Sequence, residues 1–172
     1  MYKYAHVLLC ASLFMLAGCG EVVPVWKQEV SFPEYTLYHN KAKKLEISLD
    51  FPEETSRKCR MEFEITYDIS GIGRPELPLS IILQKESGDI SPPKEFNVVV
   101  PLQAEGEWLG IPQDNEVDYV ITYIVIPDLE LEKGEYSMNL YANDNNNDQI
   151  YGVVKILARL YENEALGDEK LK

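Results

Sequence analysis

Hydrophobic and polar residues alternate along much of this chain with a period of two. In residues 45–51, four apolar side chains alternate with three polar ones. This period is typical of a half-buried β-strand, because successive side chains of a strand point to opposite faces. Alternation or a short apolar run predicts further strands at residues 26–32, 59–67, 79–83, 96–102, 117–126, 136–142 and 150–161.

These predicted strands follow one another with almost no helical periodicity between them. Turns rich in proline, glycine, aspartate and asparagine separate them, and prolines fall at or near the expected strand ends. Seven or eight strands at this spacing predict an all-β fold, an antiparallel β-sandwich with an immunoglobulin-like topology as the default. A lipocalin-like barrel is the alternative. Residues 117–126 are apolar on both faces, which favours a central strand covered on both sides.

The first 19 residues have a different pattern. Lys3 precedes an apolar run at residues 7–15, which is too short to span a bilayer core of about 30 Å as a helix. The run ends in Leu-Ala-Gly-Cys at residues 16–19, which resembles the lipobox of bacterial lipoproteins. The sequence therefore predicts cleavage between Gly18 and Cys19 and a lipid on the Cys19 thiol that holds the chain on a membrane. An ordinary secretory signal with a chance cysteine is the alternative.

The chain then divides into four predicted parts. They are a lipoprotein signal peptide at 1–18, a lipidated tether at 19–25, one β-sandwich domain at 26–161 and a disordered acidic tail at 162–172. No internal repeat, heptad pattern or second domain is visible.

Charge restricts the partners. The whole chain has a formal net charge of −13, and removal of the signal peptide takes away one lysine and no acid. A surface this negative repels phosphate backbones, so nucleic-acid binding is not expected.

The cysteines exclude an internal disulfide. Cys10 leaves with the signal peptide and Cys19 carries the lipid, so Cys59 is the one thiol left. Cys59 occupies an apolar position of an alternating segment, which favours a core residue over a reactive nucleophile.

Enzyme motifs are sparse. His39 is the one histidine after cleavage, so the sequence offers no histidine-rich zinc site. It contains no Gly-x-Ser-x-Gly turn and no glycine-rich phosphate loop. Among 29 acidic residues any two can be paired, so carboxylates alone indicate no glycosidase. We therefore expect no catalytic residue, no cofactor and no enzymatic activity.

The segment 143–149 is rich in asparagine. Asp144, Asn146 and Asp148 match the first three ligand positions of a calcium loop, but Gln149 and Lys155 occupy the positions of its glycine and its glutamate. Asparagine and aspartate also dominate tight turns. A plain connector is the first interpretation and a weak calcium site the second.

Two glycines bracket Trp108 and Leu109 in a predicted loop. A large aromatic residue there either closes one end of the sandwich or contacts a partner. We take Trp108 and Leu109 as the candidate partner-binding residues. Several tyrosines on the later strands could instead form an aromatic face for a glycan.

Residues 106–110, Gly-Glu-Trp-Leu-Gly, resemble the G-x-W-L-G element of the gliding-motility lipoprotein GldH family of the Bacteroidetes. A tyrosine-bearing segment at 119–126 and a Gly-x-Tyr turn at 134–136 follow in the same order as in that family. The family's final strand is only partly matched at 150–156, and its Met-Arg pair is replaced by the Asn-rich loop. The likeness covers roughly residues 57–161 and the lipobox.

This resemblance implies an envelope lipoprotein linked to gliding motility or to type IX secretion, with no catalytic residues to carry over. Surface export in this phylum uses acidic clusters after the cysteine, and here only Glu21 is close. We therefore expect a lipid anchor in the outer membrane facing the periplasm, and envelope proteins as partners. A surface glycan-binding lipoprotein is the alternative function.

Overall fold

The structure is a computed structural model that describes residues 22–51, 56–86, 92–115, 117–144 and 146–163. Gly18, Cys19 and the predicted signal peptide lie outside these ranges, as do residues 164–172 of the predicted tail. Within the described residues, no helix has the length and apolar composition needed to cross a bilayer.

Strands make up most of the described chain. Its elements are β1 (Trp26–Ser31), the 3-10 helix η2 (Pro33–Tyr35), β2 (Thr36–Tyr38), β3 (Lys43–Leu49), β4 (Arg57–Asp68), the short helix α2 (Ile69–Ile72), β5 (Glu76–Lys85), β6 (Lys94–Pro101), β7 (Gln103–Ala104), β8 (Glu107–Trp108), β9 (Ile111–Pro112), β10 (Asp118–Leu131), β11 (Gly134–Ala142), β12 (Gln149–Tyr151) and β13 (Val153–Glu162).

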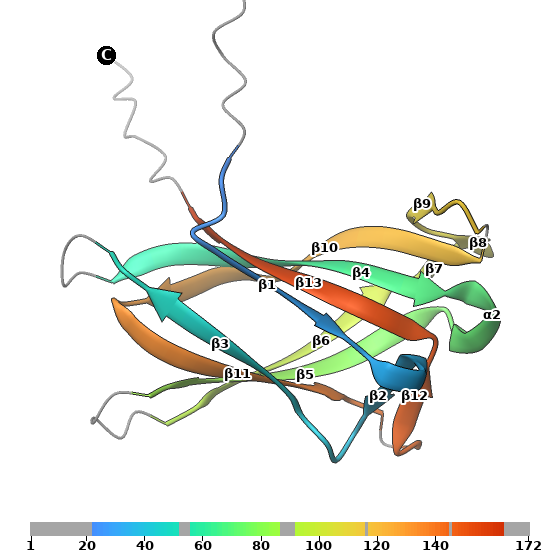
Figure 1. Ribbon diagram of the computed structural model, residues 1–172, viewed down its shortest axis with the longest axis horizontal. Coiled ribbons are helices and arrows are strands. Elements are labelled where there is room, and N and C mark those ends of the chain that lie inside the picture. The colour runs from blue at the N-terminus through green and yellow to red at the C-terminus, as the bar shows by residue number, and fades with distance from the viewer. Residues whose placement is uncertain (1–21, 52–55, 87–91, 116, 145, 164–172) are drawn as a thin grey trace, which may run out of the picture.

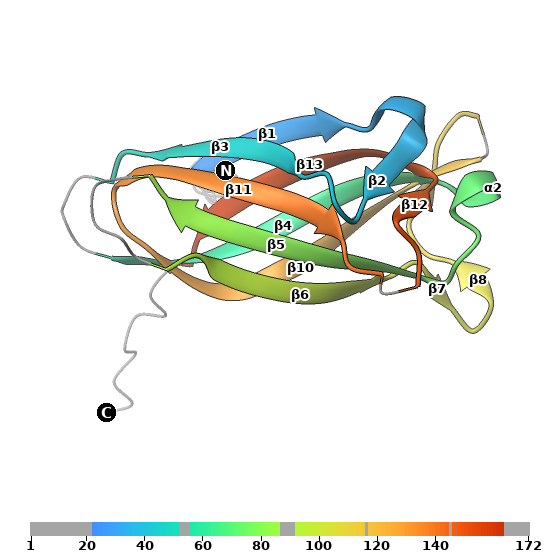
Figure 2. The same ribbon diagram turned by 90° about the horizontal axis from the view of Figure 1, so that it is seen from below.

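Two antiparallel sheets face each other (Figures 1 and 2). One has the strand order β1-β13-β4-β10-β9, and the other has the order β3-β11-β5-β6. Two short pairs, β2 with β12 and β7 with β8, lie at the right-hand end of the sandwich in Figure 1. The predicted all-β antiparallel sandwich is confirmed.

The long strands pair in a nested order. Among the described strands of six or more residues, the first pairs with the last (β1 with β13), the second with the seventh (β3 with β11), the third with the sixth (β4 with β10) and the fourth with the fifth (β5 with β6). This is the wrapping of a jelly roll. It differs from the predicted immunoglobulin-like order, in which the first strand pairs with the second. A period of two identifies a strand but not its neighbour, so alternation alone could not distinguish the two topologies.

The core lies between the sheets. Inward-facing residues of β4 are fully buried, and they are Cys59, Met61, Phe63, Ile65 and Tyr67. Leu45, Ile47 and Leu49 of β3 are also buried and face them from the second sheet. The alternation seen in the sequence thus places one apolar face of each strand in a shared core.

The predicted strands all have counterparts, with three changes towards the chain ends. Gly152, with φ of 81°, divides the last predicted strand into β12 and β13. A Cβ at Gly152 would lie 2.3 Å from the backbone nitrogen of Ile72, so only glycine fits there. Glu162, predicted to begin the tail, is the last residue of β13, and Val25 of the predicted tether already donates a backbone hydrogen bond to Leu160.

The segment 117–126 is not the central strand that its pattern suggested. β10 pairs with β4 along its length but with β9 only at Tyr119 and Val120. Ile124 is 48% exposed. The prediction was wrong because an edge strand with exposed apolar residues has the same pattern as a covered central strand. Register shifts surround Pro127, and an edge strand tolerates a proline inside it.

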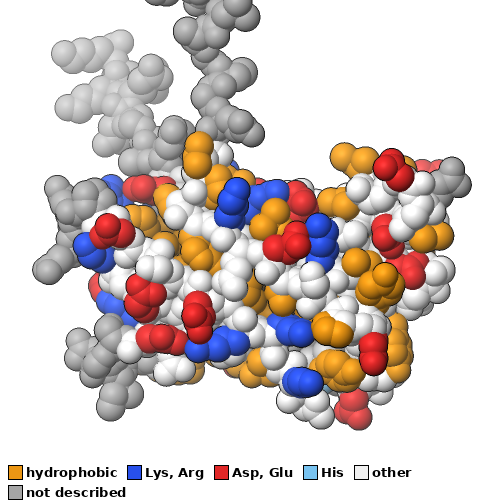
Figure 3. Space-filling view, in the orientation of Figure 1, with side chains coloured by type: hydrophobic (Ala, Val, Ile, Leu, Met, Phe, Trp, Pro, Cys, Tyr) orange, Lys and Arg blue, Asp and Glu red, His pale blue; other side chains and the backbone are white. Residues whose placement is uncertain are grey.

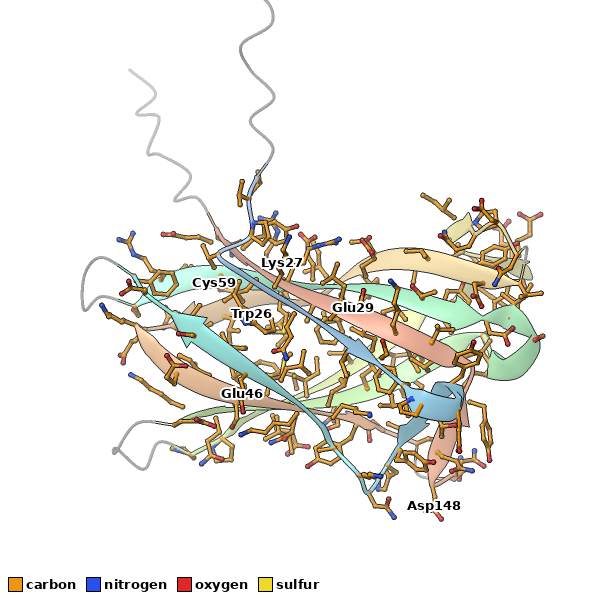
Figure 4. All side chains as sticks on the ribbon, in the orientation of Figure 1. Trp26, Lys27, Glu29, Glu46, Cys59 and Asp148 are labelled. Atoms are coloured by element: carbon orange, nitrogen blue, oxygen red, sulfur yellow. The ribbon has the colours of Figure 1, made fainter. Side chains whose placement is uncertain are left out.

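The two sides of the sandwich are closed differently. On the β1–β3 side, the Trp26 indole donates to the Glu46 carbonyl at 3.0 Å, and Glu46 donates its backbone N–H to the Gln28 side chain at 3.1 Å (Figure 4 labels Trp26 and Glu46). On the β6–β10 side, residues at inward positions such as Phe96 and Tyr123 stay partly exposed.

Candidate interaction surface

A small hairpin presents Trp108. β7 and β8 pair through Ala104 and Glu107, which leaves Glu105 and Gly106 as a two-residue turn. Both turn residues have positive φ, 52° and 86°, as a type I′ hairpin turn requires. The Glu-Gly turn therefore sets the register of the hairpin and with it the position of Trp108 in β8.

Trp108 is partly buried and packs against the core. Its ring lies 6.0 Å from the ring of Tyr67, at an angle of 50°. Of the two possibilities drawn from the sequence, this contact favours a residue that closes the end of the sandwich.

Tyr67 is the residue that organises this end, and the sequence analysis did not single it out. It is fully buried, and its hydroxyl donates to the carbonyl oxygens of Leu102 and Leu109. Burial, together with the neighbouring Tyr119, raises the pKa of Tyr67 to about 12, so the hydroxyl keeps its proton. The signal available in the sequence was a tyrosine at an inward position of an otherwise purely apolar face.

Gly110 brings the chain onto β10. It has φ of 96°, and a Cβ there would lie 2.4 Å from the carbonyl oxygen of Val120. The next residue, Ile111 of β9, pairs with Val120 of β10. Glycine is therefore required twice over, for its backbone conformation and for the close approach.

Beyond this turn, apolar side chains are exposed. Ile111 is 71% exposed and Val117 is 41% exposed. Figure 3 shows hydrophobic side chains gathered with acidic ones over the end that carries β8 and β9. We call the set of Leu109, Ile111 and Val117, of which Leu109 is half-buried, the end patch.

The charged residues that neighbour the end patch in the sequence are all acidic. No lysine or arginine occurs between Lys94 and Lys133, whereas Glu107, Asp114 and Asp118 lie close to the patch along the chain. A surface of this kind, apolar with an acidic surround, suits a partner that offers apolar side chains next to cationic ones.

Two other residues that the sequence analysis considered, His39 and Cys59, lie away from the end patch. His39 lies after β2, where its Nδ1 is 3.0 Å from the Ala142 carbonyl oxygen. Cys59 is fully buried in β4, as predicted for a core residue, and burial raises the pKa of its thiol to about 11. A buried, protonated thiol is a poor nucleophile.

Asp144 is committed to structural hydrogen bonds. The residue is 7% exposed, and its carboxylate accepts from Arg74 at 2.7 Å and from Asn146 and Asn147 at 3.0 Å each. The hydrogen bonds from Asn147, Asn146 and Arg74 hold the pKa of the Asp144 carboxyl well below its usual range. These contacts favour the connector over the calcium site, and the described part of the chain contains no group of three or more His, Cys, Asp or Glu side chains that could hold a metal ion.

No family model matches this sequence. No curated protein matches it either. Among solved structures, the chain is similar to the structure of tomato aspermy virus, at 10% identity over 94% of this chain and 97% of that chain, with a TM-score of 0.23. It is also similar to the structure of the Gx strain of infectious bursal disease virus, at 12% identity over 83% of this chain and 34% of that chain, with a TM-score of 0.22. TM-scores this low carry no argument about fold or function.

Proposed function

We propose that this chain is a non-catalytic lipoprotein of the bacterial cell envelope that binds a protein partner near the membrane. The apolar run that ends in a small-small-Cys sequence at residues 17–19 supports the lipid anchor on Cys19. The GldH-like elements in residues 106–136 support a link to gliding motility or type IX secretion, with the anchor in the outer membrane facing the periplasm.

The observation that carries the binding proposal is the end patch. Ile111 is the most exposed of its side chains, and the positive φ at Gly110 fixes its position at the tip of a short strand. Exposed apolar side chains next to an open sheet edge are typical of protein-binding surfaces. Leu109 belongs to this surface. Tyr67 connects it to Trp108, because the Tyr67 hydroxyl donates to the Leu109 carbonyl and the Tyr67 ring contacts the Trp108 ring.

The partner surface is expected to be apolar with flanking lysine or arginine residues, because the chain near the patch is acidic and lacks cations. Envelope proteins that meet this description are the expected partners.

Site-specific crosslinking tests the binding proposal. A photoreactive amino acid at Asp114, in the full lipidated chain in its own membrane, should crosslink to one envelope protein that mass spectrometry identifies. Replacing exposed Ile111 (I111D) should reduce the yield at least about tenfold, because a charge there disrupts an apolar contact. Tyr35→Asp is the matched control, since Tyr35 is 50% exposed and lies outside the patch. Equal yields with and without Ile111→Asp would contradict the proposal.

The lipid anchor is tested separately. Radiolabelled palmitate should enter the wild-type chain and should fail to enter the Cys19→Ser variant. Equal labelling of the two would contradict the anchor while leaving the end patch untouched.

The glycan alternative predicts retardation on polysaccharide affinity gels that Trp108→Ala abolishes. The partial burial of Trp108 against Tyr67 leaves less of its ring for a sugar, so we expect no effect of this substitution.

A further inference from the structure

A cavity of about 230 Å³ lies beside β2, away from the end patch in the sequence. Its lining consists of Pro33, Glu34, Thr36, Tyr38, Lys41 and Lys43. It is smaller than the sites of drug-sized ligands, which begin at about 300 Å³, so its volume suits a single sugar ring.

The backbone at this cavity is strained. Glu34 and Tyr35 both have positive φ, 61° and 51°, although neither is glycine. Two hydrogen bonds hold the turn: the Thr36 hydroxyl donates to the Glu34 carbonyl at 2.8 Å, and the Tyr35 N–H donates to the Phe32 carbonyl at 2.9 Å. Consecutive left-handed residues with side chains are costly, and residues held in such conformations cluster at binding sites.

The cavity has local positive charge in a chain whose net charge is −13. Neither Lys41 nor Lys43 takes part in any ion pair among the described residues. By contrast, Lys44 pairs with Glu46 at 3.5 Å and Glu86 at 3.3 Å. The ammonium of Lys41 lies 5.9 Å from the Tyr38 ring centre, and that of Lys43 lies 5.8 Å from the Phe32 ring centre. Two cations near aromatic rings, without a carboxylate partner, are available to an anion.

The remaining lining adds two further kinds of contact. The Tyr38 ring offers a flat apolar surface of the kind on which sugar rings stack, and the Glu34 carboxylate, also outside every ion pair of the described chain, offers an acceptor for hydroxyl groups. An anion, a ring and hydroxyls on one small molecule describe an anionic sugar.

We propose that the cavity beside β2 binds an anionic sugar residue of the uronate class, with its carboxylate between Lys41 and Lys43 and its ring against Tyr38. This site is separate from the end patch and does not rest on the proposed function. Because the whole chain is strongly negative, its net charge cannot draw an anion, and the attraction is confined to this cavity.

The full chain, purified in a non-ionic detergent, is titrated with glucuronate, glucose and inorganic phosphate by NMR. Glucuronate should bind at least about fivefold more tightly than glucose, since the charge is the main difference between them. It should also bind more tightly than phosphate, which has the charge but no ring.

Substitutions at three neighbouring lysines provide the control. Lys41→Ala and Lys43→Ala should each weaken glucuronate binding at least about threefold, and Lys44→Ala, an identical loss of charge, should change it less than about twofold. Unfolding midpoints in urea, measured on all three variants, verify that each is folded. Equal affinity for glucuronate and glucose, equal affinity for phosphate, no binding at all, or an equal effect of Lys44→Ala would each overturn the proposal.

Discussion

At the scale of single residues, the two glycines that bracket Trp108 differ in the space around them. Gly106 and Gly110 both have positive φ, but a Cβ on Gly106 would meet nothing within 4 Å, whereas a Cβ on Gly110 would meet the Val120 backbone. Conformational cost and steric cost are thus separated within one short segment. The sequence predicted a loop from both glycines and could not tell which one is indispensable.

Gly110→Ala should lower the free energy of unfolding by about 2–4 kcal/mol, because it adds a clash with Val120 to the strain of a positive φ. Gly106→Ala should cost only about 1 kcal/mol, from the φ alone. Urea unfolding of the two variants measures both values. Equal losses would show that the close approach to Val120 is unimportant.

Tyr67→Phe should lower the free energy of unfolding by about 1–2 kcal/mol, because it removes the hydroxyl donor of the Leu109 carbonyl, whereas the Leu102 carbonyl still accepts the Leu109 N–H. Tyr123→Phe is the matched control, since no hydrogen bond of its hydroxyl occurs within the described residues, and we expect little change. Thermal unfolding followed by near-UV circular dichroism compares the two. A neutral Tyr67→Phe would mean that packing, not the hydroxyl, holds this end.

At the scale of elements, alternation located every long strand but gave no pairing. Residues 45–51 and 59–67 show the same period, yet β3 and β4 belong to different sheets. Partner choice depends on side-chain contacts that are distant in sequence, such as the bond from Trp26 to Glu46. For the same reason, the candidate patch was predicted at Trp108 and Leu109, while exposed Ile111 and buried Tyr67 were missed.

We call the hydrogen bonds of Trp26 and Gln28 with Glu46 the clamp between β1 and β3. The Gln28 side chain should determine how well it protects the Glu46 amide. Gln28→Ala removes the acceptor of the Glu46 N–H, so amide exchange at Glu46 should accelerate at least about tenfold. The global free energy of unfolding should change by less than about 1 kcal/mol, since the bond is exposed. Glu29→Ala, which removes a surface ion pair with Lys155, should leave exchange at Glu46 unchanged. Hydrogen-exchange NMR measures all three, and unaltered exchange in Gln28→Ala would refute the clamp.

The hydrogen bonds that Asp144 accepts from Asn147, Asn146 and Arg74 should make the loop before β12 sensitive to acid. The pKa of Asp144 is lowered from its ordinary value of 3.8, so its stabilising effect is complete above that pH and is lost as the pH falls further. Stability of the wild type should therefore fall more steeply below pH 4 than that of Asp144→Asn. Denaturant midpoints across pH 2 to 7 test this, and parallel curves would contradict it.

At the scale of the whole molecule, both ends of the described chain leave from the same region. Val25 bonds to Leu160, which pairs with Met61, and Asn163 bonds to Lys58. Tyr67, beneath the end patch, lies six residues further along β4 than Met61, about 20 Å at the rise of an extended strand. A membrane anchor before residue 22 would therefore attach at one end of the sandwich and leave the end patch at a distance.

Strand position in the sheet should decide which truncations are tolerated. Ending the chain at Tyr151 removes β13, which lies between β1 and β4, and we expect this variant to lose cooperative unfolding. Removing residues 26–31, the edge strand β1, should leave a weaker but still cooperative transition, because β13 remains paired with β4. Calorimetry distinguishes the two results, and a cooperative transition without β13 would contradict the expectation.

The nested pairing also sets the order of events during biosynthesis. Among the described strands, β1 pairs with β13 alone. Because synthesis proceeds from the N-terminus, the five-stranded sheet cannot be completed until residue 162 has been made. Pairings between segments so distant in sequence form slowly. The first strand therefore keeps an unpaired edge for as long as the last strand has yet to be synthesised.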